Sequence, residues 1–172
     1  MDSTGFIHVY TGNGKGKTTA AIGLAVRALG AGFKVLFIQF VKGQSYSEHK
    51  ILAQFENLTL KQFGREGFIH SKPSDEDIRV AREGYEYARK ELKSGRWDLV
   101  VLDEANIAVF FNLFSEDELL ELMRTKAHNT ELVITGRYAT QRIKNAADLV
   151  TEMRELKHYF RKGVTARTGI EK

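Results

Sequence analysis

Apolar positions along the chain fall into two alternating patterns. Short runs that are almost wholly apolar predict strands at residues 5–10, 35–41, 58–63, 98–102, 131–135 and 149–153. Between these runs, apolar residues recur every three or four positions. This spacing predicts a helix over residues 16–31 and further helices that begin after Ser74 and after Ser115. Ser74 is followed by Asp77, and Ser115 by Glu118, at the three-residue spacing of a capping box.

The order of these elements indicates the class of fold. Alternating strands and helices predict an α/β fold, with a mostly parallel sheet covered by helices on both faces. Because no repeat or linker interrupts the pattern, we expect residues 1–172 to form one domain. The longest irregular stretch, residues 64–74, contains the only proline, Pro73, and is the predicted functional loop.

Composition limits the kinds of function that the protein can have. The net charge of +4 fits an anionic ligand such as a nucleotide, and it also fits weak affinity for nucleic acid. The alternative is that these lysine and arginine side chains are solvated and bind nothing. The absence of cysteine excludes disulfides, a thiolate nucleophile and a thiolate metal site. No signal-like segment or long apolar run is present, so we expect a soluble, cytoplasmic protein without a membrane partner.

A glycine-rich motif lies between the first predicted strand and the first predicted helix. In this context a loop can bind phosphate through converging backbone N–H groups and the positive end of the helix. The candidate phosphate-binding residues are Gly12, Asn13, Gly14, Lys15, Gly16, Lys17, Thr18 and Thr19. Lys17 can reach phosphate oxygens, and the Thr18 hydroxyl can bind Mg²⁺. The alternative is a glycine-rich turn without a ligand.

The loop departs from the standard phosphate-loop spacing. That pattern requires glycine at position 11, where this chain has Thr11, so starting at Gly12 makes the loop one residue shorter. A shorter loop should hold phosphates differently, and ordinary γ-phosphate hydrolysis does not follow from it.

Charged residues that follow two other predicted strands are further candidates for binding magnesium or phosphate. Asp103 and Glu104 end an apolar strand, where carboxylates can bind Mg²⁺ directly or through water; alternatively, they cap the next helix. Arg137 follows another strand end and can neutralise phosphate charge, unless it is an exposed ion-pairing residue. Arg27, in the helix after the loop, is a further nucleotide-binding candidate, with a solvated helix face as the alternative.

Together these segments resemble the ATP:corrinoid adenosyltransferases of cobalamin synthesis and salvage. The matching segments are residues 11–21, 39–43, 100–104, 135–137, 147–153, 157–158 and 163–171, in the family's order. The resemblance implies a P-loop NTPase-like, RecA-like fold that transfers the 5′-deoxyadenosyl group of ATP to Co(I) of a corrinoid and releases triphosphate. Lys17, Arg137 and Glu104 are then the expected catalytic residues, and Thr18, Glu104 and Asp103 the Mg²⁺ ligands. Because Co(I) is itself the nucleophile, no general base is needed.

The resemblance also implies contacts to the corrinoid. Residues 67–70 align with a family segment that often reads Gly-Phe-x-Trp, whose aromatic side chains crowd the lower face of the corrin. Phe68 is retained, and His70 replaces the tryptophan, where it would pack differently or bind cobalt. A homodimer and a flavoprotein-type electron donor are the partners expected besides ATP and the reduced corrinoid.

Two other function classes compete with this interpretation. A RecA-like ATPase acting on nucleic acid would require a full-length phosphate loop and a strip of basic and aromatic residues, and neither is evident. We therefore expect no nucleic-acid partner. A non-enzymatic nucleotide-binding regulator would be excluded by turnover with reduced corrinoid.

Overall fold

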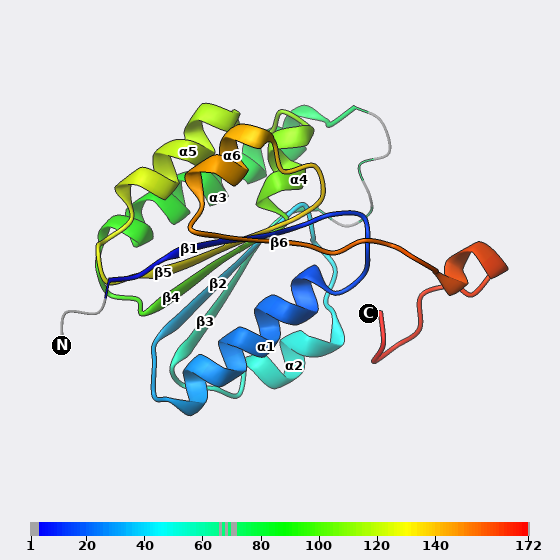
Figure 1. Cartoon of the computed structure of the whole chain (residues 1–172), viewed down its shortest axis with the longest axis horizontal. Coiled ribbons are helices and arrows are strands. Elements are labelled where there is room, and N and C mark those ends of the chain that lie inside the picture. Colours follow the sequence, from blue (N-terminus) through cyan, green and yellow to red (C-terminus); the bar gives the residue numbers. More distant parts are fainter. Residues whose placement is uncertain (1–3, 66, 68, 70–71, 172) are drawn as a thin grey trace.

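The computed structural model describes residues 4–65, 67, 69 and 72–171. Its centre is a six-stranded sheet in which every pair of neighbouring strands is parallel, in the order β3-β2-β4-β5-β1-β6 (Figure 1). The strands are β1 (Ile7–Thr11), β2 (Val35–Phe40), β3 (Leu58–Phe63), β4 (Leu99–Asp103), β5 (Glu131–Thr135) and β6 (Leu149–Glu152). The predicted α/β fold with a parallel sheet is confirmed.

Helices cover both faces of the sheet. The helices are α1 (Lys17–Gly30), α2 (Ser47–Leu52), α3 (Asp75–Lys93), α4 (Ala105–Phe110), α5 (Glu116–Thr125) and α6 (Gln141–Ala146), followed by the 3-10 turn η1 (Tyr159–Lys162). In Figure 1, α1 and α2 lie on one face, and α3, α4, α5 and α6 lie on the other. Within the described part of the chain, no helix has both the length and the apolar content that a membrane span requires.

Strand β2 shows why the sheet carries helices on both faces. Every residue of β2 is buried. Val35 and Phe37 belong to the core under α1, which includes Ala21 and Ala25. The alternate residues Leu36, Ile38 and Phe40 belong to the core under α3, α4 and α5. Since successive side chains of a strand point to opposite faces, a continuous apolar run is what a two-sided core requires.

The predicted capping boxes are both present. The Ser74 hydroxyl accepts a hydrogen bond from the Asp77 backbone N–H at 3.2 Å, and the Asp77 carboxylate accepts one from the Ser74 N–H at 2.8 Å. Ser115 and Glu118 form the equivalent pair at the start of α5. These local contacts satisfy backbone groups that a helix end leaves unpaired.

The parallel sheet determines where a site can form. Because all strands run in the same direction, the residues that end them lie along one edge. Thr11, Phe40, Asp103 and Thr135 end β1, β2, β4 and β5 at this edge. It is therefore the edge at which the glycine-rich loop after β1 meets Asp103 at the end of β4.

Candidate functional site

The glycine-rich loop joins β1 to α1 and is packed against the segment after β6. Gly12 and Gly16 have φ angles of 98° and 117°, in the left-handed region that favours glycine. The Gly14 N–H donates to the Met153 carbonyl oxygen at 2.7 Å. A Cβ added to Gly12 or Gly14 would lie only 2.4 or 2.8 Å from that oxygen. These glycines therefore shape the loop and allow the neighbouring chain to approach it.

Lys17 lies inside this loop. Its side chain is buried at the start of α1, and its Nζ donates to the carbonyl oxygens of Gly12 at 2.9 Å and Gly14 at 2.7 Å. Burial lowers the pKa of Lys17, while the nearby Glu104 carboxylate acts in the opposite direction. The loop thus holds a partly desolvated cation at the helix N-terminus, where an anion would be stabilised.

Asp103 connects three strands and the loop. The side chain is 0 % exposed, and its two oxygens accept four hydrogen bonds. Oδ1 accepts from the hydroxyls of Thr18 at 2.8 Å and Thr135 at 2.6 Å, and Oδ2 accepts from Gln39 Nε2 at 3.1 Å and Lys42 Nζ at 2.8 Å. A carboxylate with this many donors is fully satisfied, so Asp103 orients its neighbours.

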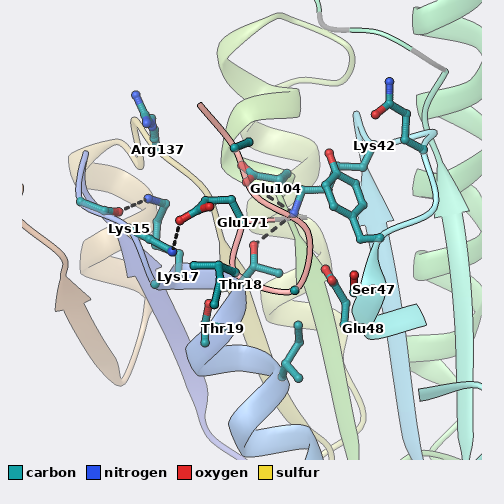
Figure 2. A pocket seen from close by; sticks show the side chains of 18 of the residues that line it. Lys15, Lys17, Thr18, Thr19, Lys42, Ser47, Glu48, Glu104, Arg137 and Glu171 are labelled. Atoms are coloured by element: carbon teal, nitrogen blue, oxygen red, sulfur yellow. Dashed lines mark hydrogen bonds and ion pairs between the residues drawn. The ribbon is translucent and has the colours of Figure 1, made fainter. Parts of the chain in front are cut away.

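Lys42 is the second cation of the site. Besides Asp103, its Nζ contacts the Thr18 hydroxyl oxygen at 3.1 Å and Glu104 Oε1 at 3.9 Å (Figure 2). Burial alone would lower the pKa of Lys42, but Asp103 and Glu104 outweigh it and raise the pKa above its ordinary value. The Tyr46 ring lies 5.6 Å from this ammonium, at the distance of a cation–π contact.

Glu104 follows β4 in a strained backbone conformation. Its φ of 59° lies in the left-handed region, which costs a non-glycine residue on the order of 1–3 kcal/mol. Its backbone N–H donates to the Thr135 hydroxyl at 3.0 Å, and this bond helps to hold the turn. Burial and then the Asp103 charge raise the pKa of Glu104. The carboxylate lines the cavity beside Lys42.

The C-terminal segment returns to the loop through Glu171. The Glu171 carboxylate pairs with Lys15 Nζ at 2.8 Å and with the Arg167 guanidinium at 3.1 Å, and it accepts a hydrogen bond from the Tyr159 hydroxyl. Lys15 also donates to the Tyr159 hydroxyl at 3.0 Å. The Lys15 ammonium is therefore bound to the C-terminal segment.

These parts surround a cavity of about 820 Å³, within the usual size range of ligand pockets. The glycine-rich loop and the start of α1 form one wall, α2 and residues 42–46 form another, and residues 166–171 form a third. Figure 2 shows Lys17, Thr18, Glu104, Arg137 and Glu171 around this space.

Most of the sequence-predicted site residues line the cavity. Those that do so are Asn13, Gly14, Lys15, Gly16, Lys17, Thr18, Thr19, Glu104 and Arg137. Gly12 shapes the loop through its backbone, and Asp103 lies behind Thr18. Phe68 and His70 lie outside the described residues.

Arg27 is not brought to the cavity. It is an exposed residue in the last turn of α1, whereas the loop lies at the first turn. Arg27 is ten positions from Lys17 along the helix, which corresponds to about 15 Å of rise. This position agrees with the alternative interpretation, in which Arg27 lies on a solvated helix face.

The sequence interpretation assigned no role to several residues that build the site. Lys42 belongs to a segment that resembles the family, and it follows the end of the buried strand β2, as Glu104 follows the end of β4. Gln39 lies inside that strand, and His49 Nε2 holds its side-chain oxygen at 2.7 Å, so that its amide nitrogen faces Asp103. Neither Gln39 nor Glu171 carries a local sequence signal, because their partners are distant in the chain.

The oxygen groups of the site fit a magnesium ion that shares its coordination with a phosphate. Thr18 supplies a hydroxyl oxygen and Glu104 a carboxylate, both at the cavity wall. Among the described residues, no three histidine, cysteine, aspartate or glutamate side chains gather as an all-protein metal site. Mg²⁺ is commonly held by one or two carboxylates together with substrate phosphates, so this donor set is suitable.

Comparison with known proteins gives consistent matches over the whole chain. The sequence profile of the ATP:corrinoid adenosyltransferase BtuR/CobO/CobP family matches residues 3–171. A corrinoid adenosyltransferase of Escherichia coli (strain K12) is 35% identical over 171 residues, covering 99% of this chain and 87% of the relative. A corrinoid adenosyltransferase of Pseudomonas aeruginosa is 37% identical over 172 residues, covering 99% and 85%. The corrinoid adenosyltransferase CobA of Salmonella typhimurium is 32% identical over 171 residues, covering 99% and 87%.

Proposed function

The chain belongs to the ATP:corrinoid adenosyltransferase family, and we propose that the cavity above its phosphate loop holds ATP for this reaction. The enzyme transfers the adenosyl group of ATP to a corrinoid. The main observation that supports this site is the buried Lys17 ammonium within the glycine-rich loop. The loop lies beside a cavity that Arg137 and Glu104 also line.

The proposed reaction breaks the bond between C5′ of the ribose and its phosphate oxygen. Co(I) of the corrinoid supplies the electron pair for the new Co–C bond, and triphosphate leaves with the electrons of the broken C–O bond. A highly charged leaving group requires cations placed in advance, and Lys17 and Arg137 are the proposed ones. Since the corrinoid itself supplies the nucleophile, the proposed chemistry requires no general base.

The short loop supports a departure from ordinary phosphate hydrolysis. Lys17 is fixed by the loop carbonyls of Gly12 and Gly14. We propose that the loop binds the triphosphate as a leaving group, with the nucleotide reversed relative to a hydrolytic enzyme. The RecA-like ATPase alternative is not favoured, because the matched family is an adenosyltransferase.

Thr18 and Glu104 are the proposed magnesium ligands, with Asp103 orienting Thr18. Mg²⁺ would neutralise charge that develops on the leaving triphosphate. Asp103 accepts the Thr18 hydroxyl hydrogen at 2.8 Å, which leaves the hydroxyl lone pairs directed elsewhere. This assignment separates the two acidic residues by role: Glu104 binds the ion and Asp103 positions the hydroxyl.

Residues 64–74 are the proposed corrinoid-facing loop. The segment begins beside the site, because a Cβ on Gly64 would lie 2.5 Å from the Lys42 backbone nitrogen. Ile69 packs against the core under α3, α4 and α5, which gives the segment a second contact with the fold. Phe68 lies between Gly64 and Ile69 in the sequence and is the proposed contact to the corrin ring. His70 is in the position of the family tryptophan.

The remaining assignments are also proposals. We propose a homodimer and a flavoprotein-type electron donor that keeps the corrinoid cobalt reduced. A single domain over residues 1–172 and a cytoplasmic location stay predictions.

One experiment tests the proposed chemistry directly. The protein is incubated with ATP, Mg²⁺ and chemically reduced cobalamin, and formation of the light-sensitive Co–C product is followed by absorbance. The expected phosphorus product is triphosphate, in equal amount to the alkylated corrinoid. Release of orthophosphate from ATP without corrinoid would support an ATPase instead.

A further inference from the structure

We propose that Lys42 occupies the magnesium-binding oxygens of this site and competes with the metal for them. The proposal rests on the function and the magnesium ligands proposed above. It assigns Lys42 as a positioning residue whose ammonium must move when metal and nucleotide bind.

The contacts of Lys42 coincide with the proposed metal ligands. Its Nζ lies 3.1 Å from the Thr18 hydroxyl oxygen and 3.9 Å from Glu104 Oε1. The Thr18 hydroxyl donates its hydrogen to Asp103 and accepts one from Lys42. One of the two lone pairs of the hydroxyl oxygen that would face a metal is thus already used by the ammonium.

Charge balance explains why a cation lies at this point. Asp103 is fully buried and Glu104 is close beside it, so two carboxylates share a poorly solvated edge of the sheet. Lys42 contacts both and is itself mostly buried, with 18% of its side chain exposed. Buried carboxylates require a counterion, and Lys42 supplies one within the chain.

Lys42 and Mg²⁺ cannot use the same oxygens together. A magnesium ion binds oxygen at about 2.0–2.1 Å, and an ammonium on the same oxygens would place two cations within a few ångströms of each other. Metal binding therefore turns the Lys42 side chain away from Thr18 and Glu104. The side chain lines the cavity, so the displaced ammonium meets the bound triphosphate.

This exchange couples the two ligands. Without nucleotide, a metal ion must displace Lys42 from Thr18 and Glu104 while the ammonium gains no new anion. With nucleotide, the triphosphate receives the displaced cation. Each ligand consequently favours binding of the other, and the coupling acts equally in both directions.

The test measures metal binding directly, without turnover. Mn²⁺, which prefers the same oxygen ligands as Mg²⁺, is titrated into protein without nucleotide and followed by electron paramagnetic resonance. The variants are Lys42→Met, Lys42→Arg and the matched control Lys50→Met, on an exposed position of α2 that does not line the cavity. Lys42→Met should bind Mn²⁺ about tenfold more tightly than wild type, which equals ~1.4 kcal/mol. Lys42→Arg and Lys50→Met should remain as weak as wild type.

A second titration measures the coupling. Adding ATP should tighten Mn²⁺ binding strongly in wild type and by a smaller factor in Lys42→Met. Circular dichroism and thermal unfolding establish that each variant is folded; if Lys42→Met is not, Lys42→Gln replaces it with the same expectations. Unchanged or weaker Mn²⁺ binding by the folded neutral variant overturns the proposal. Failure of wild type to adenosylate cobalamin would instead overturn the proposed function, and the metal titration distinguishes the two outcomes.

Discussion

The Lys17 ammonium lies 2.7 Å from the carbonyl oxygen of Gly14, within the loop that precedes its own helix. The loop thereby holds the cation in place before a ligand arrives, so little reorganisation is needed when an anion binds. Only 7% of Lys17 is exposed, and in such surroundings a charge interacts strongly with a bound phosphate.

Lys17→Ala should therefore nearly abolish adenosyl transfer. Removing one partner of a largely desolvated charge pair costs about 2–5 kcal/mol, which predicts a loss of roughly 30- to 5,000-fold in kcat/KM. Steady-state kinetics with ATP and reduced cobalamin measure this change. Lys90→Ala, at an exposed position of α3, is the control and should keep wild-type activity. Activity of Lys17→Ala within threefold of wild type would contradict the placement.

Glu104→Gln should stabilise the protein in a pH-dependent way. Burial and then the Asp103 charge raise the pKa of Glu104 above its ordinary value of 4.5, so the folded state binds this proton more tightly than the unfolded state. Wild type therefore loses stability as the pH rises through the window between the two pKa values. The melting temperature of the variant should exceed that of wild type at pH 8, and the difference should close as the pH falls toward 4.5.

The same variant should also need more Mg²⁺ for turnover, with little change in corrinoid affinity. A stability difference that does not vary with pH would argue against an ionised, desolvated Glu104. An unchanged Mg²⁺ titration would leave Asp103 as the better candidate ligand.

Glu171→Gln should loosen the C-terminal wall of the cavity. Hydrogen bonding from Arg167, and next from Lys15, holds the pKa of Glu171 far below its ordinary value, so its contacts depend on the charged form. The neutral amide should weaken ATP binding severalfold and speed tryptic cleavage near Arg167. Glu56→Gln, at an exposed position before β3, serves as the control. Wild-type ATP affinity and cleavage rate in the Glu171 variant would show that the segment closes the cavity without this anchor.

Two glycine-to-alanine changes in helices should have opposite effects on stability. A Cβ on Gly84 of α3 would lie 2.6 Å from Phe63 Cγ and 2.8 Å from Phe40 Cε1, so Gly84→Ala should destabilise by about 1–3 kcal/mol through overpacking. Gly23 of α1 has open space at this position, and Gly23→Ala should stabilise by about 0.5–1 kcal/mol. Urea unfolding measures both. A stable Gly84→Ala would mean that α3 can move away from β3 at little cost.

Phe68→Ala should lower the rate with cobalamin strongly and leave ATP binding and the melting temperature almost unchanged. The expected reason is loss of an apolar contact to the corrin ring. Kinetics with varied cobalamin, together with thermal unfolding, separate the alternatives. A loss of about 3 kcal/mol or more in stability would instead identify Phe68 as a core residue.

Local signals explain what the sequence could predict. The capping boxes at Ser74 and Ser115 involve residues three positions apart, and they were predicted correctly. The continuous apolar runs of β2 and β4 reflect burial on both faces, whereas β6, predicted from a similar run, is a strand whose four residues are all exposed. Helices α2, α4 and α6 have only six residues each, too few to display an apolar period, and they were not predicted.

The site depends on contacts that local patterns do not encode. Lys42 reaches Asp103 only because β2 lies beside β4 with Gln39 opposite Asp103. Lys15 was predicted to bind phosphate from its place in the loop, but its contact with Glu171 joins residues 156 positions apart. Contacts of this kind depend on how distant parts of the chain are arranged in the fold, which the spacing of a single motif does not predict.

The position of β1 in the sheet has a consequence for biosynthesis. Val9 lies between Ile134 of β5 and Val150 of β6, so the strand that leads into the glycine-rich loop has both of its neighbours late in the chain. The ribosome makes Leu132, the partner of Ile7, about 125 residues after Ile7. At a rate of synthesis of roughly 5–20 residues per second, both edges of β1 stay unpaired for roughly 6–25 s before β5 has been made. The nascent chain is therefore exposed to aggregation and to chaperone capture for this time at the strand that leads into the glycine-rich loop.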